Sequence, residues 1–212
     1  MLTQQLKWLL VAAILSSVMA AQPLVQIQPS TLDVAATGVQ LVSLDDIGHT
    51  ATVEELLGQD GAMVAKLLPY TALVVNGSSR KLRAVTVRWT WKKSTGKPGG
   101  ITLTLTSMSR ADDPTQMVPG DGQLFTPIQS VNQYLGLQHQ IRRGGSTTAA
   151  SGAGVGRAPV DYNSIIPKQL GLMDIASDVQ AFLDGVVFED YSFVGTDRLF
   201  SSLQRYEPKV HR

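Results

Sequence analysis

A two-residue alternation dominates Leu82-Arg83-Ala84-Val85-Thr86-Val87-Arg88-Trp89-Thr90-Trp91. The valines and tryptophans fall on one face of an extended chain, and Thr86, Arg88 and Thr90 fall on the other. Ile101-Thr102-Leu103-Thr104-Leu105-Thr106 repeats this pattern. Alternation with β-branched and aromatic residues is typical of a strand that has one face on a core and one in water. We therefore predict two strands, with both tryptophans on the core face and Trp91, beside a turn, the more exposed of the two.

Turn residues predict how the strands are connected. The segment from Lys92 to Gly100 joins the two alternating runs and predicts a hairpin. Asn76-Gly77-Ser78-Ser79 follows the apolar run Tyr70–Val75, and Asn-Gly between apolar runs predicts a hairpin with the strand of Trp89. A turn at 119–122 leads into Gln123-Leu124-Phe125-Thr126. The last strand is expected over Val179–Phe188, with a bulge at Gly185.

This spacing of short strands and turns predicts an all-β protein with an antiparallel, immunoglobulin-like β-sandwich. Two segments depart from it. Apolar residues over 53–68 have roughly helical spacing, but Gly58 and Gly61 interrupt them, so we expect a short or broken helix. Thr196-Asp197 can cap a C-terminal helix with an apolar stripe formed by Leu199, Phe200, Leu203 and Tyr206.

The N-terminus has the order of a secretory signal peptide. Lys7 precedes the apolar run Trp8–Leu15, and the small-residue exit Val18-Met19-Ala20 follows it. The run is shorter than the roughly 20 residues that span a bilayer, which favours a cleaved signal over a membrane anchor. We expect cleavage after Ala20, with Ala21 as the alternative, and export to the periplasm or the extracellular space.

Composition narrows the compartment and the partners. The chain has no cysteine, and an exported protein without disulfides suits a bacterial envelope better than a small disulfide-stapled domain. Loss of Lys7 with the signal takes the formal charge from +1 to 0, and the basic residues are not clustered in a way that selects nucleic acid. No membrane span is expected after signal cleavage, because no later apolar run is long enough.

The expected organisation is a signal peptide over 1–20, a polar lead-in segment over 21–37 and a single β-sandwich domain over 38–212. Within that domain, 144–157 is rich in Gly, Ser and Ala and predicts a flexible loop. The loop could instead divide two domains. We favour one, because the part that follows has too few elements to bury a core alone.

The chain shows little sign of catalytic chemistry. Gly152-Ala153-Gly154-Val155-Gly156 lacks the offsets and flanks of a nucleotide-binding loop. His49, His139 and His211 lie in no recognisable triad or zinc spacing, so no catalytic residue and no cofactor is assigned. Carboxylates beside turns are the remaining candidates, because loops at one end of a sandwich can supply the oxygen ligands of calcium. These calcium candidates are Asp184, Glu189, Asp190, Asp112, Asp113 and Asp121.

The tail from Leu183 to Asp197, together with Leu73–Asn76 and Val85–Trp91, resembles a group of uncharacterised exported bacterial proteins with an immunoglobulin-like β-sandwich. In that group a similar strand ends in Phe-x-Asp-Gly and continues into Phe-Val-Gly-Pro-Asp before a terminal helix. Tyr191 and Thr196 stand here where the pattern has Gly and Pro. The resemblance covers about a third of the chain, and it implies an exported sandwich without indicating an activity or site.

These features predict a non-catalytic binding or interaction module, with strand edges or the 142–158 segment as contact surfaces. Another envelope protein or a glycan is the expected partner. The alternative is an exported hydrolase or calcium-dependent carbohydrate-binding protein that uses the loop carboxylates. A subunit that donates a strand to a partner is a third hypothesis, and it requires a long unpaired edge strand.

Overall fold

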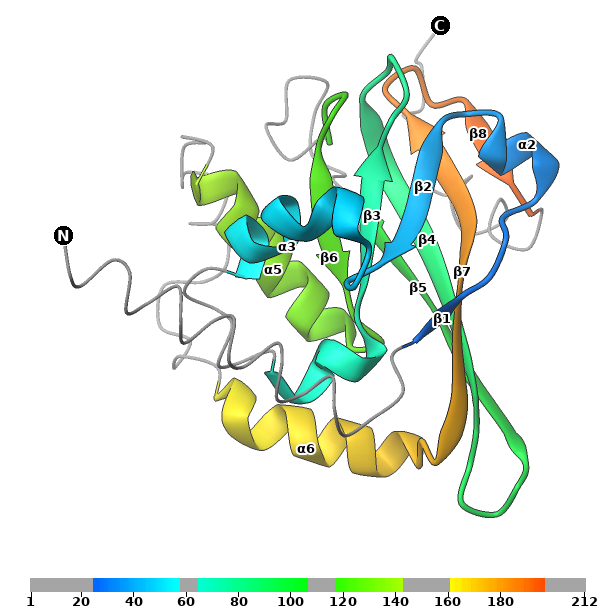
Figure 1. The fold of residues 1–212 in the computed structure, drawn as a ribbon, viewed down its shortest axis with the longest axis vertical. Coiled ribbons are helices and arrows are strands. Elements are labelled where there is room, and N and C mark those ends of the chain that lie inside the picture. Colours follow the sequence, from blue (N-terminus) through cyan, green and yellow to red (C-terminus); the bar gives the residue numbers. More distant parts are fainter. Residues whose placement is uncertain (1–24, 58–64, 107–116, 143–160, 197–212) are drawn as a thin grey trace, which may run out of the picture.

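The computed structural model describes residues 25–57, 65–106, 117–142 and 161–196, which form two sheets and a set of helices (Figure 1). The strands are β1 (Gln26–Ile27), β2 (Val39–Ser43), β3 (Ala72–Asn76), β4 (Leu82–Lys92), β5 (Pro98–Thr106), β6 (Gly122–Phe125), β7 (Ser177–Phe188) and β8 (Phe193–Gly195). The helices are α2 (Leu32–Ala35), α3 (Thr50–Leu57), α5 (Gln129–Arg142) and α6 (Tyr162–Met173), with the 3-10 turns η1 (Ile47–His49) and η3 (Ala65–Tyr70).

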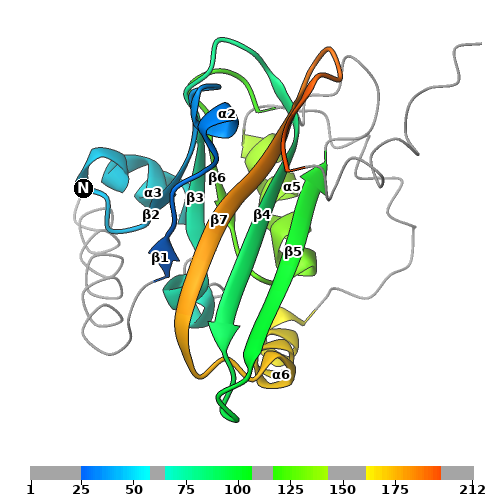
Figure 2. The ribbon, with the colours of Figure 1, turned by 90° about the vertical axis from the view of Figure 1, so that its right-hand side faces the viewer.

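The larger sheet contains β4 and β5, the two strands predicted from alternating apolar and polar residues. Its order is β1-β7-β4-β5, and β8 pairs with β7 beyond the end of β1 (Figure 2). β4 is antiparallel to both β5 and β7, which confirms the predicted 92–100 hairpin, whereas β1 runs parallel to β7. The bulge predicted at Gly185 is present: Thr86 pairs with Gly185 and Val87 with Leu183, so Asp184 is the extra residue.

The smaller sheet has the order β2-β3-β6 and is antiparallel. The predicted hairpin between Tyr70–Val75 and the strand of Trp89 is wrong, because β3 and β4 lie in different sheets. Both edges of β3 are already taken by β2 and β6. The fully buried Asn76 donates from Nδ2 to the carbonyls of Arg80 and Met117 (both 2.9 Å). These bonds fix the segment after β3 as it passes from the smaller sheet to β4 in the larger sheet, where a hairpin turn was predicted.

Two apolar cores lie on opposite faces of the smaller sheet. The first fills the space between the sheets, with Val39, Val74 and Phe125 facing Val87 and Trp89. The second lies between the smaller sheet and the helices and is built on Leu73 and Leu124. Its helical side comprises Val53, Leu56 and Leu57 of α3, Leu67 and Leu68 of η3, Val131 and Leu135 of α5, and Ile166 of α6. The layers are therefore sheet, sheet and helices (Figures 1 and 2).

Both tryptophans lie in the first core, as their shared face predicts. Trp89 is fully buried and Trp91 is 6 % exposed, so Trp91 is the more exposed of the two, as predicted, but it is still a buried residue. The Trp91 Nε1–H donates to the carbonyl of Met173 at the end of α6 (3.0 Å), and that of Trp89 donates to Tyr70 (3.1 Å). Each indole thus buries its ring and satisfies its one polar group.

The helical layer makes the all-β prediction only partly correct. The chain is mostly β with antiparallel and mixed sheets, and the short or broken helix expected near 53–68 corresponds to α3 and η3. Helices α5 and α6 were not predicted. Helix α6 is capped at its N-terminus by Asp161, whose carboxylate accepts from the N–H of Asn163, and at its C-terminus by Asp174 in the left-handed conformation, φ 53°. Its apolar residues cover the end of the second core.

Several predicted segments lie outside the described residues: the signal peptide over 1–20, the loop over 144–157 and the C-terminal helix after Thr196. The lead-in segment over 21–37 is partly described and holds β1 and α2, where a linker or a strand was expected. In the part of the chain that the structure describes, no helix has the length and apolar character required to cross a membrane.

Candidate functional site

The calcium candidates that the structure describes, Asp121, Asp184, Glu189 and Asp190, make separate contacts. Asp112 and Asp113 lie outside the described residues. Within residues 25–57, 65–106, 117–142 and 161–196, no three His, Asp or Glu side chains come together as a metal site would require. The positions of the four described acids show what each does instead.

Asp184 lies on the outer face of the larger sheet, at the bulge of β7. Its side chain is 8 % exposed, and Oδ1 lies 3.5 Å from Nε of Arg88 on β4. The Arg88 guanidinium carbon also lies 4.1 Å from the centroid of the Phe182 ring. The carboxylate therefore faces a cation that lies over an aromatic ring, which is an arrangement that stabilises the sheet surface.

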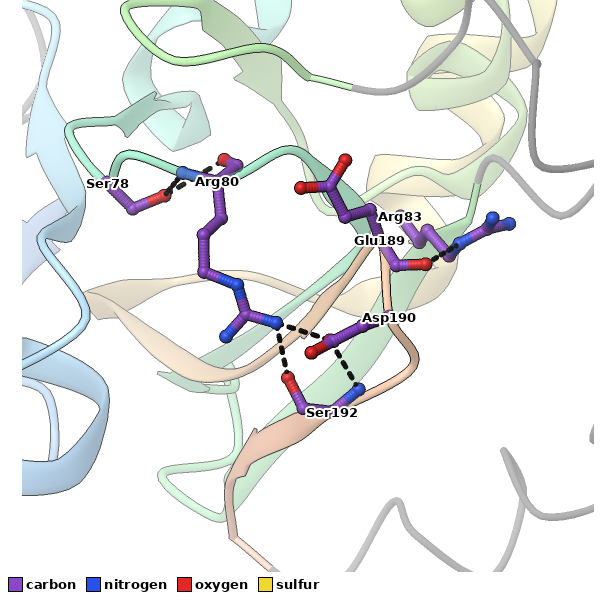
Figure 3. A network of polar contacts seen from close by, with 6 residues as sticks. All are labelled: Ser78, Arg80, Arg83, Glu189, Asp190 and Ser192. Carbon is purple, nitrogen blue, oxygen red and sulfur yellow. Dashed lines mark hydrogen bonds and ion pairs between the residues drawn. The ribbon is translucent and has the colours of Figure 1, made fainter.

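Asp190 lies in the turn between β7 and β8 and forms an ion pair with Arg80 (Figure 3). Nη2 of Arg80 also donates to Oγ of Ser192 (2.8 Å), and the Ser192 N–H donates to Oδ1 of Asp190 (3.0 Å). Hydrogen bonds from the hydroxyl and the N–H of Ser192, together with the charge of Arg80, hold the pKa of Asp190 below its ordinary value. Because the Arg80 guanidinium lies 4.0 Å from the ring centroid of Phe188, this network fastens the turn to the sheet.

The backbone of Glu189 rather than its carboxylate provides the contacts seen in the same turn. Its carbonyl accepts from Nε of Arg83 (2.9 Å), and its N–H donates to the carbonyl of Lys81 (3.0 Å). The Arg83 guanidinium lies 4.3 Å from the ring centroid of Tyr191, a residue with φ 66°. Two arginines and two acids therefore gather at this turn, and these four charges balance (Figure 3).

Asp121 has a structural role in the turn before β6. It is 3 % exposed, and Oδ2 accepts from the N–H of Val118 (2.9 Å). Its own carbonyl accepts from the N–H of Asn76 (2.8 Å), which ties the turn to the end of β3. An aspartate bonded to the backbone of its own turn is the usual turn and capping use of this residue type.

The outer edge of β5 is one of the strand edges that the sequence predicts, without naming the strand, as contact surfaces. β5 pairs with β4 along nine positions, and no strand in the described ranges pairs with its other edge. The direction of its backbone groups follows from the hairpin: the Lys93 N–H bonds to the Lys97 carbonyl (2.9 Å), so alternation turns Gly99, Ile101 and Leu103 toward β4. The N–H and C=O groups of Gly100, Thr102 and Thr104 therefore point away from the sheet.

One hydrogen bond from a described side chain reaches this outer edge, at its C-terminal end. Gln129, the first residue of α5, donates from Nε2 to the carbonyl of Thr104 (3.2 Å). Natural edge strands are usually short or carry charged residues, which discourage pairing with another chain. β5 spans nine residues, Pro98-Gly-Gly-Ile-Thr-Leu-Thr-Leu-Thr106, without a charge. The absence of charge in an alternating run was a signal available from the sequence.

The described part of the chain thus offers an open strand edge and charge-balanced turns rather than a cluster of catalytic or metal-binding side chains. The acids expected to act together are distributed over the bulge of β7, the β7–β8 turn and the turn before β6. Comparison of the chain with protein-family models, with curated proteins and with solved structures gives no match.

Proposed function

We propose that this protein is an exported, non-catalytic interaction module of the bacterial periplasm or cell exterior, which binds an extended segment of another envelope protein along the open edge of β5. The observation that carries the proposal is the uncharged outer edge of this nine-residue strand. An exposed row of N–H and C=O groups is a template for an added strand, and main-chain hydrogen bonds then supply much of the affinity.

The two faces of β5 define the partner segment. Ile101 and Leu103 are partly buried and pack against the core between the sheets, whereas the Thr102 side chain lies exposed on the opposite face. A strand added beside β5 would place alternate side chains over these two surfaces. The matching segment therefore alternates apolar residues, on the side of the core, with polar residues on the outer face.

The context of the chain agrees with this role. The apolar run over 8–15 followed by small residues supports export, and the absence of cysteine suits the bacterial envelope. Two sheets packed across one apolar core support a relationship to immunoglobulin-like sandwiches, which serve widely in recognition. That last point is an analogy of fold and carries less weight than the geometry of β5.

The test uses a proline at an outward-facing position. The N–H of Thr102 points away from β4, so Thr102→Pro removes a donor that the sheet does not use, at an edge position where proline is tolerated. Thr102→Val is the matched control, because it removes the hydroxyl and leaves the backbone edge intact. Both variants and the natural protein are crosslinked in the native envelope through a photoreactive residue at Lys97, beside the strand, and crosslinked peptides are identified by mass spectrometry.

We expect one reproducible partner segment of alternating apolar and polar residues, retained by Thr102→Val and lost in Thr102→Pro. Circular dichroism and thermal melting establish that both variants remain folded. The proposal is overturned if the crosslinked segment survives Thr102→Pro, if no segment is captured, or if only a second copy of this chain is captured.

A further inference from the structure

A groove of about 400 Å³ lies on the outer face of the larger sheet, at the end nearest the β4–β5 hairpin. In Figure 2 this is the lower end of β7, β4 and β5. The groove crosses β1, β7, β4 and β5, so relatively rigid strands supply most of its lining. The lining residues are Gln26, Thr90, Trp91, Lys92, Gly96, Pro98, Gly99, Asp178 and Gln180.

The floor of the groove is a single cross-strand row. Gln26 pairs with Gln180, Gln180 with Thr90, and Thr90 with Gly100. Residues in register on neighbouring strands point to the same face about 5 Å apart. Two amides and a hydroxyl therefore stand side by side, and the glycine leaves the row open toward the edge of β5.

These polar side chains are available to a ligand. The side chains of Gln26, Thr90 and Gln180 have no hydrogen-bond partner among residues 25–57, 65–106, 117–142 and 161–196. Each amide offers both donors and an acceptor, and the hydroxyl offers one donor with two lone pairs. The row thus presents both donors and acceptors, at the fixed spacing of neighbouring strands.

The groove is electrically balanced. Its one lining cation, Lys92, lies 2.6 Å (Nζ to Oδ2) from its one lining anion, Asp178. That pair removes the net charge that a phosphate or a carboxylate ligand would require. Pro98 and Gly99 add apolar surface beside the polar row, whereas the Trp91 indole itself is buried in the core on the other face of the sheet. The lining contains a single carboxylate, too few oxygen ligands for a calcium site.

We infer that this groove binds a neutral saccharide. A sugar ring carries hydroxyl groups that both donate and accept, which match the two amides and the threonine. It also has apolar C–H faces, which match the proline and glycine surface. An open groove of this size fits one or two rings of a longer chain. The inference concerns a different surface from the β5 edge and holds whether or not that edge takes a partner strand.

Saturation-transfer NMR with the full-length protein tests this inference, with cellotetraose, maltotetraose and chitotetraose as the probes. We expect saturation transfer to at least one of them. Gln180→Ala should weaken its affinity by about tenfold, as expected for the loss of one or two hydrogen bonds. The exposed Gln26→Ala provides a second variant that does not threaten folding, and Gln169→Ala on the exposed face of α6 is the matched control. Affinity should change little with salt, because the ligand is neutral.

Three results would overturn the inference. The first is the absence of saturation transfer to all three tetrasaccharides. The second is binding that Gln180→Ala and Gln26→Ala leave unchanged, or that Gln169→Ala weakens equally. The third is affinity that falls steeply with ionic strength, because such binding depends on charge. Thr102→Pro should leave saccharide binding intact, which separates failure of this inference from failure of the strand-addition proposal.

Discussion

Arg88 Nε lies 3.5 Å from Oδ1 of Asp184, across the outer face of the central β4–β7 pair. The separation makes the contact an ion pair rather than a hydrogen bond. The two side chains differ in environment, since that of Arg88 is 32 % exposed and that of Asp184 is 8 % exposed. The Asp184 carboxylate therefore gains more from the ion pair than Arg88 does, because little water reaches it to solvate its charge if the guanidinium is removed.

Replacing Arg88 should therefore destabilise the protein. Arg88→Met keeps an apolar stem beside Phe182 but leaves the Asp184 carboxylate without its countercharge, and we expect a loss of about 1–3 kcal/mol in the free energy of unfolding. Urea denaturation measures it. In the Arg88→Met/Asp184→Asn double variant part of this loss should be recovered, because the uncompensated charge is gone. Strict additivity of the two single changes would show that the ion pair contributes nothing.

Gly99 and Gly171 give a second prediction, in which the same substitution has opposite effects. A Cβ at Gly99 would overlap the Trp91 indole, which is held by its bond to the Met173 carbonyl, whereas a Cβ at Gly171 meets nothing within 4 Å. We expect Gly99→Ala to lower stability by about 1–3 kcal/mol through overpacking and to shift tryptophan fluorescence. Gly171→Ala should raise stability by about 0.5–1 kcal/mol, because alanine favours the helix. Thermal melting of the two variants measures whether stability falls in Gly99→Ala and rises in Gly171→Ala. The same change in melting temperature in both would contradict the packing argument.

The strands were predictable because their signal is local. In β4 the side chains alternate between the core and a more polar surface. The apolar residues Val85, Val87 and Trp89 therefore recur at every second position, and this period is visible in the sequence. The bulge was predictable for a similar reason, because glycine at 185 weakens a regular strand. The pairing of the strands was harder to predict. Asn76-Gly77 indicates a turn, but a turn can lead either to a neighbouring strand of the same sheet or to a strand of the facing sheet.

The helical layer was missed because its apolar pattern is weak and interrupted. Helix α5 buries Val131 and Leu135 among glutamines, and Pro167 lies inside α6. Their position over the smaller sheet depends on contacts with segments far away in sequence, which no local window contains. The candidate acids failed to converge for the same reason. Asp184 and Asp190 are six residues apart, yet a bulge and a turn direct them to different arginines.

Ser192 gives a prediction about acid sensitivity. Its hydroxyl and N–H, with Arg80, lower the pKa of Asp190, so the folded state binds fewer protons than the unfolded state when that carboxyl titrates. The stabilisation from Asp190 is therefore present at neutral pH and lost as the pH falls below about 4 and through the folded-state pKa. Ser192→Ala should raise the pKa of Asp190 and reduce this acid-dependent loss.

Carbon-detected NMR titration of the Asp190 carboxyl measures the change directly. Ser164→Ala on α6, which also removes a serine hydroxyl bonded near an aspartate, should leave the Asp190 titration where it was. An unchanged pKa of Asp190 in Ser192→Ala would show that Arg80 and the backbone N–H alone control the carboxyl.

Asn132 provides the sharpest prediction for the helical layer. It is fully buried on α5, and its Oδ1 accepts from the N–H (2.7 Å) and the hydroxyl (2.9 Å) of Thr126, while Nδ2 donates to the Thr126 carbonyl (2.8 Å). One side chain thus satisfies three polar groups of the residue that follows β6. Asn132→Leu keeps the volume and leaves the N–H and the carbonyl of Thr126 buried without a partner, whereas the hydroxyl keeps its contacts with the backbone of Ile128 (3.2 and 3.3 Å). We therefore expect a loss of about 2–4 kcal/mol in the free energy of unfolding.

Gln133→Leu, at the exposed neighbouring position, is the matched control and should change stability by less than about 0.5 kcal/mol. Hydrogen exchange of the Thr126 N–H adds a local measurement: protection at this amide should fall in Asn132→Leu beyond the fall in global stability, because the acceptor is gone while β6 remains paired with β3. If protection of the Thr126 N–H falls only as much as global stability does, Asn132 acts only through the overall stability of the fold. If neither falls, the side chain is not the link between α5 and the smaller sheet.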